Sequence, residues 1–392
     1  MPLHPRLPAV ALLAAACLAG LVSAPAQARD QDHNHNHNQH HDSLDQQLEE
    51  LVRTPGGPPG VIALLRRGDH TEVHRAGVAE VGTDRAPEPT DHMRIASVAK
   101  AFSGAVALDL VDSGRLSLDD TIGKVLPALP EAWHAVTLRQ LLQHTSGLPD
   151  YTTSPELQEI LRTDPHHVFD SRRLLDFVAG EPLLFPPGSQ YQYSNSDNIA
   201  VALMAEAVTG RRYEELLKKI VYRPLGLRNT SLPQGFRIPE PYLHGYDVVP
   251  PNPPEDISTL LGASGVWASG GIISTPADMT RFVSAYASGE LISRPTHEQQ
   301  LTWVDGASEP AGPGVNAAGL AIFRYTTRCG VVYGHTGNFP GYTQLVAATP
   351  DGQRSLTFSI TTHVNQTNKP ELLAELRNIQ ENFVCALLKK KH

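Results

Sequence analysis

Lysine, cysteine and long apolar runs are scarce in this chain of 392 residues, and these scarcities limit its partners, its disulfides and its relation to membranes. The formal net charge is −9 and the one basic block, residues 389–391, ends the chain, so we expect no nucleic-acid partner. Beyond residue 28 no stretch approaches the roughly 18 consecutive apolar residues that a membrane-spanning helix needs. We therefore expect a mature protein with no stable membrane anchor and with enough chain to bury a large core.

The N-terminus has the pattern of a secretory signal peptide. An apolar run over residues 7–22 follows Arg6, and Ala26-Gln27-Ala28 has small residues where a signal peptidase reads. We predict a signal peptide over residues 1–28 and a secreted, extracellular protein. Cys17 lies in the apolar run, but Ala14 stands where a lipid-modified cysteine usually has a leucine, which argues against a lipoprotein.

Residues 29–43 are rich in histidine and asparagine and have no apolar periodicity. Such a segment cannot bury a core, so we predict a disordered linker. Its histidines lack a fixed geometry, and we expect no defined metal site there. Once the signal peptide is removed, Cys329 and Cys385 remain. In an exported chain this pair suggests one disulfide, and two free buried thiols are the alternative.

Strand patterns occupy both ends of the chain and helical patterns the middle. Strands are predicted over 60–67, 72–78, 330–334, 342–348 and 355–361, and helices over 43–52, 97–112, 138–143, 171–178, 198–208, 213–221, 276–288 and 370–388. The economical architecture is α+β: an α/β sandwich with one antiparallel sheet flanked by helices, plus an all-α insertion. We assign residues 44–115 and 261–392 to the sheet domain and residues 116–260 to the insertion, with a ligand cleft between them.

Ser97 and Lys100 form an S-x-x-K pattern at the start of a predicted helix. Residues three apart share one face of a helix, so the serine hydroxyl and the lysine amine can meet. A serine becomes nucleophilic beside a base, and a desolvated neutral lysine can be that base. Lys100 is the only one of eight lysines with a serine three residues before it. The same sequence pattern would nevertheless occur at an exposed start of a helix with a solvated lysine.

Tyr193 and Asn195 form a second candidate motif, Y-x-N, after the turn-rich residues 185–188. The phenol could relay a proton between the serine and a leaving group, and the amide could hold a substrate carbonyl. The structural alternative is a packed tyrosine followed by an asparagine that caps the next helix.

A third candidate motif, His335-Thr336-Gly337, is predicted to end the strand over residues 330–334. A strand beside a reactive serine can align an extended substrate, the Thr336 hydroxyl could bind a carboxylate, and Gly337 permits close backbone approach. The backbone N–H groups of Asn338 and Ser97 could form an oxyanion hole. An ordinary strand end is the alternative.

The order and spacing of these motifs resemble those of the penicillin-recognising serine hydrolases. The likeness runs from about Leu51 to Cys385 and rests on SVAKAFSGAVALDLVDSGRLSLDD, LLQHTSGLPDY, FPPGSQYQYSNSDNIA, GGIISTPADM and CGVVYGHTGNFPGY. Among these enzymes the chain looks most like the secreted soluble D-alanyl-D-alanine carboxypeptidases, and next like class C β-lactamases and related esterases. His335 tilts it towards the peptidases, because class C β-lactamases typically carry lysine there.

The resemblance implies a β-lactamase/DD-peptidase-like fold and an acyl-enzyme mechanism that needs no metal or organic cofactor. It implies catalytic roles for Ser97, Lys100 and Tyr193, and substrate-binding roles for Asn195, His335, Thr336, Gly337 and Asn338. Cys329 and Cys385 also resemble a disulfide pair of the peptidase group.

The chain departs from the peptidase pattern at the residue that binds the terminal carboxylate of the substrate. Those peptidases carry an arginine where this chain has Phe323, with Arg324 beside it. Adjacent side chains on a strand face opposite ways, so Arg324 is expected to point away from the cleft, which leaves carboxylate recognition open. Asn338 also replaces a common hydroxyl residue. We interpret residues 144–147 (HTSG) as structural.

The sequence thus predicts a secreted serine hydrolase, a D-alanyl-D-alanine carboxypeptidase that acts on peptidoglycan stem peptides and binds penicillin. Its partners would be small peptide or β-lactam substrates and cell-wall peptidoglycan, and we expect a monomer. The alternatives are an esterase, a D-amino-acid amidase or a β-lactamase on the same scaffold, or a protein that binds β-lactams or wall peptides without useful turnover.

Overall fold

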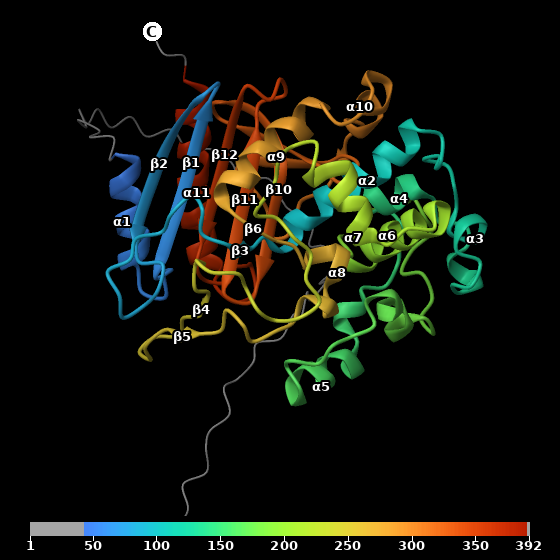
Figure 1. The fold of residues 1–392 in the computed structure, drawn as a ribbon, viewed down its shortest axis with the longest axis horizontal. Coiled ribbons are helices and arrows are strands. Elements are labelled where there is room, and N and C mark those ends of the chain that lie inside the picture. Colours follow the sequence, from blue (N-terminus) through green and yellow to red (C-terminus); the bar gives the residue numbers. More distant parts are fainter. Residues whose placement is uncertain (1–42, 390–392) are drawn as a thin grey trace, which may run out of the picture.

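A computed structural model describes residues 43–389 of the chain (Figure 1). The predicted signal peptide lies outside the described residues, as does the predicted linker apart from Ser43. The fold is α+β, as predicted: one large antiparallel sheet flanked by helices, with most of the other helices gathered beside it.

Eight strands form the large sheet in the order β2-β1-β12-β11-β10-β9-β8-β7. Every neighbouring pair is antiparallel, and the two ends of the chain meet where β1 pairs with β12. The strands are β1 (Gly60–Arg67), β2 (His70–Gly77), β7 (Val304–Asp305), β8 (Val315–Ala318), β9 (Phe323–Thr327), β10 (Gly330–Phe339), β11 (Tyr342–Ala348) and β12 (Arg354–Ile360). Most residues of β1, β11 and β12 are buried, because helices cover both faces of the sheet.

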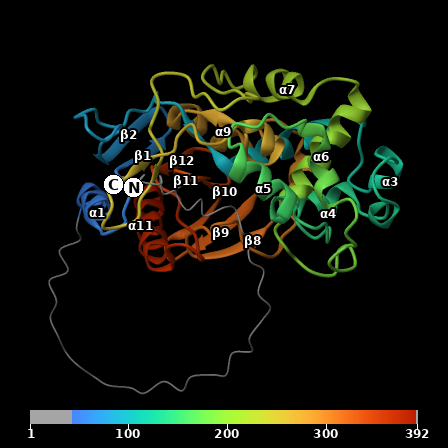
Figure 2. The same ribbon diagram turned by 90° about the horizontal axis from the view of Figure 1, so that it is seen from below.

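Two helical layers enclose the sheet (Figure 2). Helices α1 (Leu44–Arg53) and α11 (Pro370–Leu388) lie on one face, where Leu48 and Phe383 join a buried cluster with alternate strand residues. Helix α9 (Pro276–Ser288) lies on the other face, in a larger core that also contains α2 (Ala99–Asp112).

Most of the remaining helices pack around α2 at the side of the sheet (Figure 1). They are α3 (Ile122–Val125), α4 (Leu138–Leu142), α5 (Pro155–Thr163), α6 (Asn195–Thr209), α7 (Tyr213–Leu216) continued by a π-helical turn (Leu217–Tyr222), α8 (Trp267–Gly270) and α10 (Arg294–Gln300). Five 3-10 helices (Ala96–Val98, Glu131–Trp133, Tyr151–Thr153, Ser171–Val178, Ala263–Gly265) and two small pairs of strands, β3 (Met93–Arg94) with β6 (Ile273–Ser274) and β4 (Tyr246–Asp247) with β5 (Glu255–Asp256), complete the elements within residues 43–389. The division into a sheet domain and a helical insertion at residues 116 and 260 stays a prediction.

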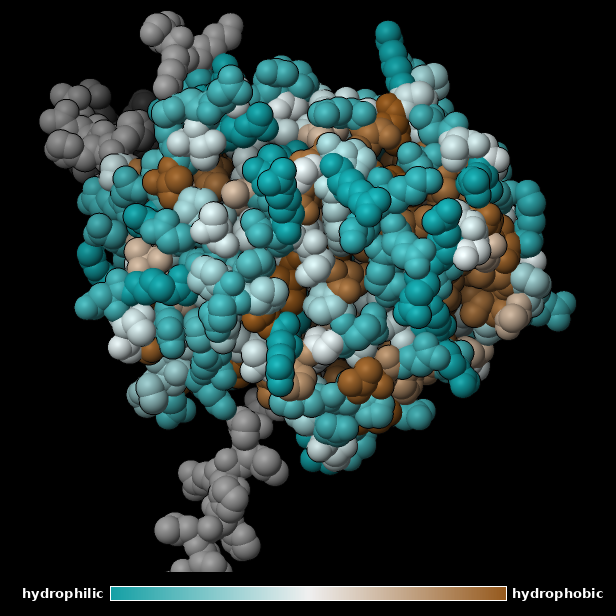
Figure 3. Space-filling view, in the orientation of Figure 1, coloured by the Kyte–Doolittle hydropathy of each residue, from teal (hydrophilic) through white to brown (hydrophobic). Residues whose placement is uncertain are grey.

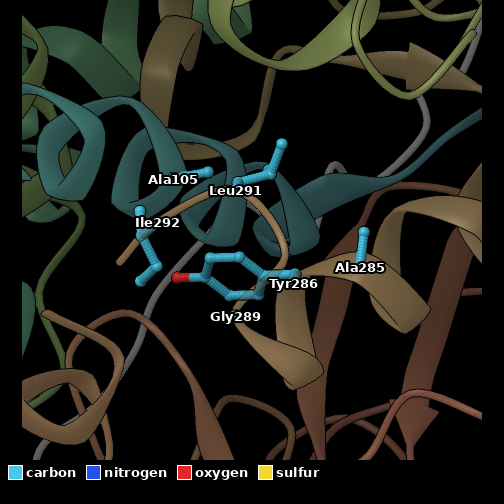
Figure 4. A pocket seen from close by; sticks show the side chains of 6 residues that line it. All are labelled: Ala105, Ala285, Tyr286, Gly289, Leu291 and Ile292. Atoms are coloured by element: carbon cyan, nitrogen blue, oxygen red, sulfur yellow. The ribbon is translucent and has the colours of Figure 1, made fainter. Parts of the chain in front are cut away.

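Helix α2 carries the S-x-x-K motif and is buried along most of its length. Every residue from Ala99 to Leu108 is buried, so α2 lacks the polar face of a surface helix. Gly104 permits this packing, because a Cβ there would come within 2.4 Å of the Ala321 Cβ. Figure 4 shows a pocket beside this contact, lined by Ala105, Ala285, Tyr286, Gly289, Leu291 and Ile292. The pocket is apolar apart from the Tyr286 hydroxyl, which donates to the carbonyl of Ala321 at 3.1 Å.

Three predicted element boundaries near the motifs were wrong. The helix predicted from residue 198 begins at Asn195, because Ser194 is its N-cap, so the second motif enters α6. The α-helix predicted from residue 97 begins at Ala99, because Ala96 has a left-handed φ of 51° and Ala96–Val98 form a 3-10 turn. The strand predicted to end at residue 334 continues to Phe339, because residues 335–339 pair with β11. The third motif therefore lies within a strand.

The structure contains the disulfide suggested by the cysteine count. Cys329, in the turn between β9 and β10, is bonded to Cys385 of α11, with 5.1 Å between their Cα atoms. The bond therefore fastens the closing helix to the sheet. No helix within residues 43–389 is both long enough and apolar enough to cross a bilayer. On the face shown in Figure 3, apolar residues form separate patches among hydrophilic ones.

Candidate active site

The first two predicted motifs meet at the Lys100 amine. Its Nζ lies 3.0 Å from the Ser97 Oγ and 2.7 Å from the Asn195 Oδ1. The third contact, at 2.8 Å, is the carbonyl oxygen of Ser269 in α8. Three segments that are far apart in the sequence thus converge on one amine.

Local backbone geometry presents Ser97 at the start of α2. The left-handed φ of Ala96 turns the chain sharply, at a cost of about 1–2 kcal/mol for a residue with a Cβ. The following 3-10 turn leads directly into α2, so Ser97 and Lys100 lie one turn apart. Ser97 is 9% exposed, whereas Lys100 is fully buried. Backbone strain of this kind clusters at functional sites.

Burial determines the protonation of Lys100. The loss of hydration lowers its pKa from 10.5 to about 7, although the carboxylates of Asp150, Glu309 and Asp197 oppose this shift. The amine is therefore substantially neutral near pH 7. A neutral amine has two N–H donors and one lone pair. Asn195 and Ser269 each offer it a carbonyl oxygen, so the lone pair is left for the Ser97 hydroxyl.

Asp150 holds the Asn195 amide in this orientation. Its Oδ2 accepts hydrogen bonds from the Asn195 backbone N–H at 3.0 Å and from the Asn195 Nδ2 at 2.9 Å. With Nδ2 engaged, Oδ1 must face Lys100. Asn195 is the first residue of α6, after Ser194 as N-cap, so the beginning of that helix is built into the site.

Tyr193 lies beside the same amine. Its ring centre is 4.9 Å from the Lys100 Nζ, and the ring also packs against the His144 ring. The hydroxyl is buried without a well-formed hydrogen bond within residues 43–389, while burial raises its pKa well above 10 and the nearby Ser97 hydroxyl partly offsets this. Tyr193 is therefore a protonated phenol at neutral pH and has a proton that it can give.

Strand β10 passes directly beside Ser97. A Cβ on Gly337 would lie 2.6 Å from the Ile95 carbonyl oxygen and 3.0 Å from the Ser97 nitrogen, so only glycine permits this approach. Pairing with β9 ends at Gly334 and Phe323, whereas pairing with β11 continues to the turn after Phe339. The edge of residues 335–339 that faces away from β11 is thus unpaired. By the alternation of antiparallel hydrogen bonds, the Asn338 N–H points to that edge.

The other groups of the third motif carry no positive charge. His335 is fully buried, and the loss of hydration lowers its pKa to about 3. Its Nδ1 lies 2.5 Å from the Thr336 carbonyl oxygen, and its ring packs edge-on against Phe323. The Asn338 side chain is also engaged, because its Nδ2 donates to the Val364 carbonyl at 2.8 Å.

The groups expected to bind a substrate carboxylate are occupied or turned away. The Thr336 hydroxyl is buried and donates to the Pro310 carbonyl at 2.5 Å. Arg324 stacks on the Trp303 ring at 5.2 Å, and its cross-strand partner is Tyr333. Phe323 faces the opposite side of the sheet, in the cluster that includes α11. Arg324 therefore points away from the neighbouring Phe323–His335 contact.

The HTSG segment contacts the site through the His144 ring, which packs against Tyr193. The His144 Nδ1 lies 2.8 Å from the Asp197 Oδ2, and the Ser146 Oγ donates to Asp197 Oδ1 at 2.5 Å. Burial lowers the pKa of His144 to about 3 and raises that of Asp197 well above its usual range. The pair is best described as a neutral, hydrogen-bonded contact under the Tyr193 ring. Ser146 is held in this contact, away from Lys100.

Sequence analysis missed Asp150, Ser269 and Glu309. Asp150 follows the HTSG segment by three residues, and this proximity was the one available signal. Ser269 contributes only a backbone carbonyl, which no sequence pattern reveals. Glu309 lies in an irregular loop, and its relation to Lys100 depends on the tertiary structure.

Comparison with known proteins gives matches over most of the chain. The sequence profile of the Beta-lactamase family matches residues 44–381. A penicillin-binding protein of Bacillus subtilis is 27% identical over 315 residues, covering 76% of this chain and 67% of that protein. A D-aminopeptidase of Brucella anthropi is 33% identical over 190 residues, covering 47% of this chain and 35% of that protein. The chain thus matches about a third of the aminopeptidase.

A solved structure of similar extent is also known. The D-stereospecific amidohydrolase from a Streptomyces species is 30% identical, with a TM-score of 0.72. The match covers 82% of this chain and 94% of the amidohydrolase.

Proposed function

The chain belongs to the beta-lactamase family of serine hydrolases and has the fold of that family, and we propose that it hydrolyses amide bonds of small D-amino-acid derivatives through an acyl-enzyme on Ser97. The Lys100 amine carries this proposal. It lies 3.0 Å from the Ser97 hydroxyl, and burial lowers its pKa to about 7. A serine paired with a neutral base is the arrangement that nucleophilic catalysis requires.

In the acylation step, Lys100 takes the Ser97 proton and the Ser97 Oγ attacks the substrate carbonyl carbon. The negative charge that develops on the carbonyl oxygen would be held by the backbone N–H groups of Ser97 and Asn338. The Gly337 contact supports this role, because it places the Ser97 nitrogen against β10 one residue before Asn338.

Breaking the amide bond requires a proton on the leaving nitrogen. The Tyr193 phenol is protonated at neutral pH and its ring lies beside Lys100, which supports it as the donor, and the proton on Lys100 replaces the one that the phenol gives up. Water then attacks the Ser97 ester with Lys100 as base. The products are the free acid and the original serine.

Two substrate groups fit this chemistry. Amides and aminoacyl peptides of D-amino acids come first, because the two groups considered for a terminal carboxylate are otherwise engaged: Arg324 stacks on Trp303, and the Thr336 hydroxyl donates to the Pro310 carbonyl. The similar proteins named D-aminopeptidase and D-stereospecific amidohydrolase support the same choice.

The D-alanyl-D-alanine carboxypeptidase activity expected from the sequence is the second candidate. The Cys329–Cys385 disulfide and His335 favour it, because both resemble features of the secreted peptidases. A disulfide is also typical of an oxidising compartment, which supports the proposal that the protein is exported. An esterase, a β-lactamase and a non-hydrolysing binder remain alternatives for the same site.

Release of product from two substrates tests these proposals. We expect the purified protein to hydrolyse D-alanine p-nitroanilide faster, in kcat/KM, than it releases D-alanine from an N-acylated peptide ending in D-Ala-D-Ala. Ser97→Ala should lower either activity by on the order of a million-fold. Lys124→Ala, which alters an exposed lysine, is the control for Lys100→Ala, for which we expect a loss of about 100- to 10,000-fold.

The opposite order of substrates would select the carboxypeptidase. Covalent labelling of Ser97 by a β-lactam without turnover of either substrate would select the binder. Turnover that survives Ser97→Ala would overturn the proposed mechanism.

A further inference from the structure

Within residues 43–389, Glu309 is the most exposed of the three acidic residues that act electrostatically on Lys100. Glu309 is an exposed residue, whereas Lys100, Tyr191 and Tyr193 are all largely shielded from solvent. The Glu309 carboxylate nevertheless interacts electrostatically with each of these three groups. It therefore acts on the buried reactive groups from a more exposed position.

The loop that carries Glu309 is anchored on both sides. The Tyr191 hydroxyl donates to the Ala307 carbonyl at 2.6 Å, and the Ser308 hydroxyl lies 3.1 Å from the hydroxyl of Tyr325. On the other side, the Pro310 carbonyl accepts the Thr336 hydroxyl. Residues 307–310 are thus tied to the segment that leads to Tyr193 and to the third motif, so the position of Glu309 is built into the site.

The Glu309 carboxylate is free to bind a ligand. Within residues 43–389 it forms no hydrogen bond or ion pair with another side chain. The nearby Asp150 is different, because its oxygens accept from Asn195 and from the Thr152 N–H and hydroxyl. Asp197 is buried and bound to Ser146 and His144.

The charges around Ser97 also favour a cation. Arg324 is turned to Trp303, and His335 is neutral. Protein on several sides removes part of the hydration of Glu309 despite its exposure, which raises its pKa to about 7; Asp150 adds to this shift and Lys100 opposes it. A bound ammonium group would favour the ionised carboxylate.

From this placement we propose that Glu309 binds the free α-ammonium group of the substrate and so selects D-aminoacyl amides and peptides with an unblocked amino end. This inference rests on the proposed function and names the substrate class of the same site. A carboxylate on the exposed side of the site would attract a primary ammonium group and would repel a substrate that ends in a carboxylate at that position.

Two chromogenic substrates that share one leaving group test the proposal. D-alanine p-nitroanilide carries the ammonium group, and N-acetyl-D-alanine p-nitroanilide lacks it. The readout is the ratio of their kcat/KM values, which cancels any change common to both. For Glu309→Gln we expect this ratio to fall about 5- to 10-fold, mostly through KM, as for one partly screened charge pair. Glu309→Lys should lower it further.

Asp305→Asn is the matched control, because it removes an exposed carboxylate from the strand just before the loop. It should leave the ratio within about twofold of the native value. An unchanged ratio in both Glu309 variants would overturn the assignment, while Ser97-dependent turnover would still support the proposed function. If the native protein turns over neither substrate, the proposed function fails together with this inference. The rate of β-lactam labelling of Ser97 then shows whether the protein is correctly folded.

Discussion

Asp150 determines which end of the Asn195 amide faces the Lys100 amine. It accepts the Asn195 Nδ2 at 2.9 Å, and the Asn195 Oδ1 consequently receives a hydrogen bond from Lys100 at 2.7 Å. Without Asp150 the amide could rotate and present its own N–H₂ to Lys100, which would compete with Ser97 for the lone pair. The carboxylate also stabilises the charged form of Lys100. One residue thus affects both the orientation and the basicity of the site.

The rate of acylation should depend on pH through Lys100. Its pKa is lowered to about 7, and the neutral amine acts as the base, so kcat/KM for a substrate without a titrating group should rise as pH increases through about 7. N-acetyl-D-alanine p-nitroanilide is suitable. Glu309 also has a pKa near 7, so the same profile is measured for Glu309→Gln. Loss of the acid limb in that variant would contradict the assignment to Lys100.

Asp150→Asn should move this acid limb to lower pH. Removing a negative charge near Lys100 destabilises the ammonium form and lowers its pKa further. We also expect kcat to fall, because an asparagine at this position no longer specifies the orientation of Asn195. Asp119→Asn, at an exposed position, is the control. A limb displaced to higher pH would show that Asp150 does not act on the base.

Gly337→Ala should lower kcat by on the order of 100-fold, the loss typical of a disturbed oxyanion site. The added methyl group would meet the Ile95 carbonyl at 2.6 Å and the Ser97 nitrogen at 3.0 Å, so β10 must shift away from Ser97. Gly180→Ala is the matched control, because its methyl group would have no neighbour within 4 Å. Native-like kcat in Gly337→Ala, measured under saturating substrate, would argue against this role of the strand.

Replacing both Cys329 and Cys385 with serine should destabilise the protein. The bond closes a loop with a sequence separation of 56 residues, and a loop of this length corresponds to about 4 kcal/mol as an upper estimate of the chain-entropy effect. The free energy of unfolding is obtained from denaturant titration of the native and double-serine proteins. Adding a reductant to the native protein should give a similar loss. A difference below about 0.5 kcal/mol would mean that α11 is held by packing alone.

The local elements were largely predictable because their patterns are local. The bounds of β1, β11, α9 and α11 agree with the predicted ranges, since apolar periodicity and turn residues set them. Helix α5 was missed although its pattern is local, while other errors lie where a distant contact decides. β10 extends through His335 and Gly337 because β11 pairs with it there, and β7 and β8 were not predicted because such short strands exist only through their partners.

The motifs by themselves determined that a serine, a lysine, a tyrosine and an asparagine were available at the spacing of a serine hydrolase. This information is local, since S-x-x-K needs one helical turn and Y-x-N needs three residues. The tertiary structure decided how these groups are used. It buried Lys100 and thereby shifted its pKa, and it turned Arg324 onto Trp303. It also brought Asp150 and Glu309 to the same amine, because desolvation and long-range electrostatics depend on neighbours that lie far apart along the chain.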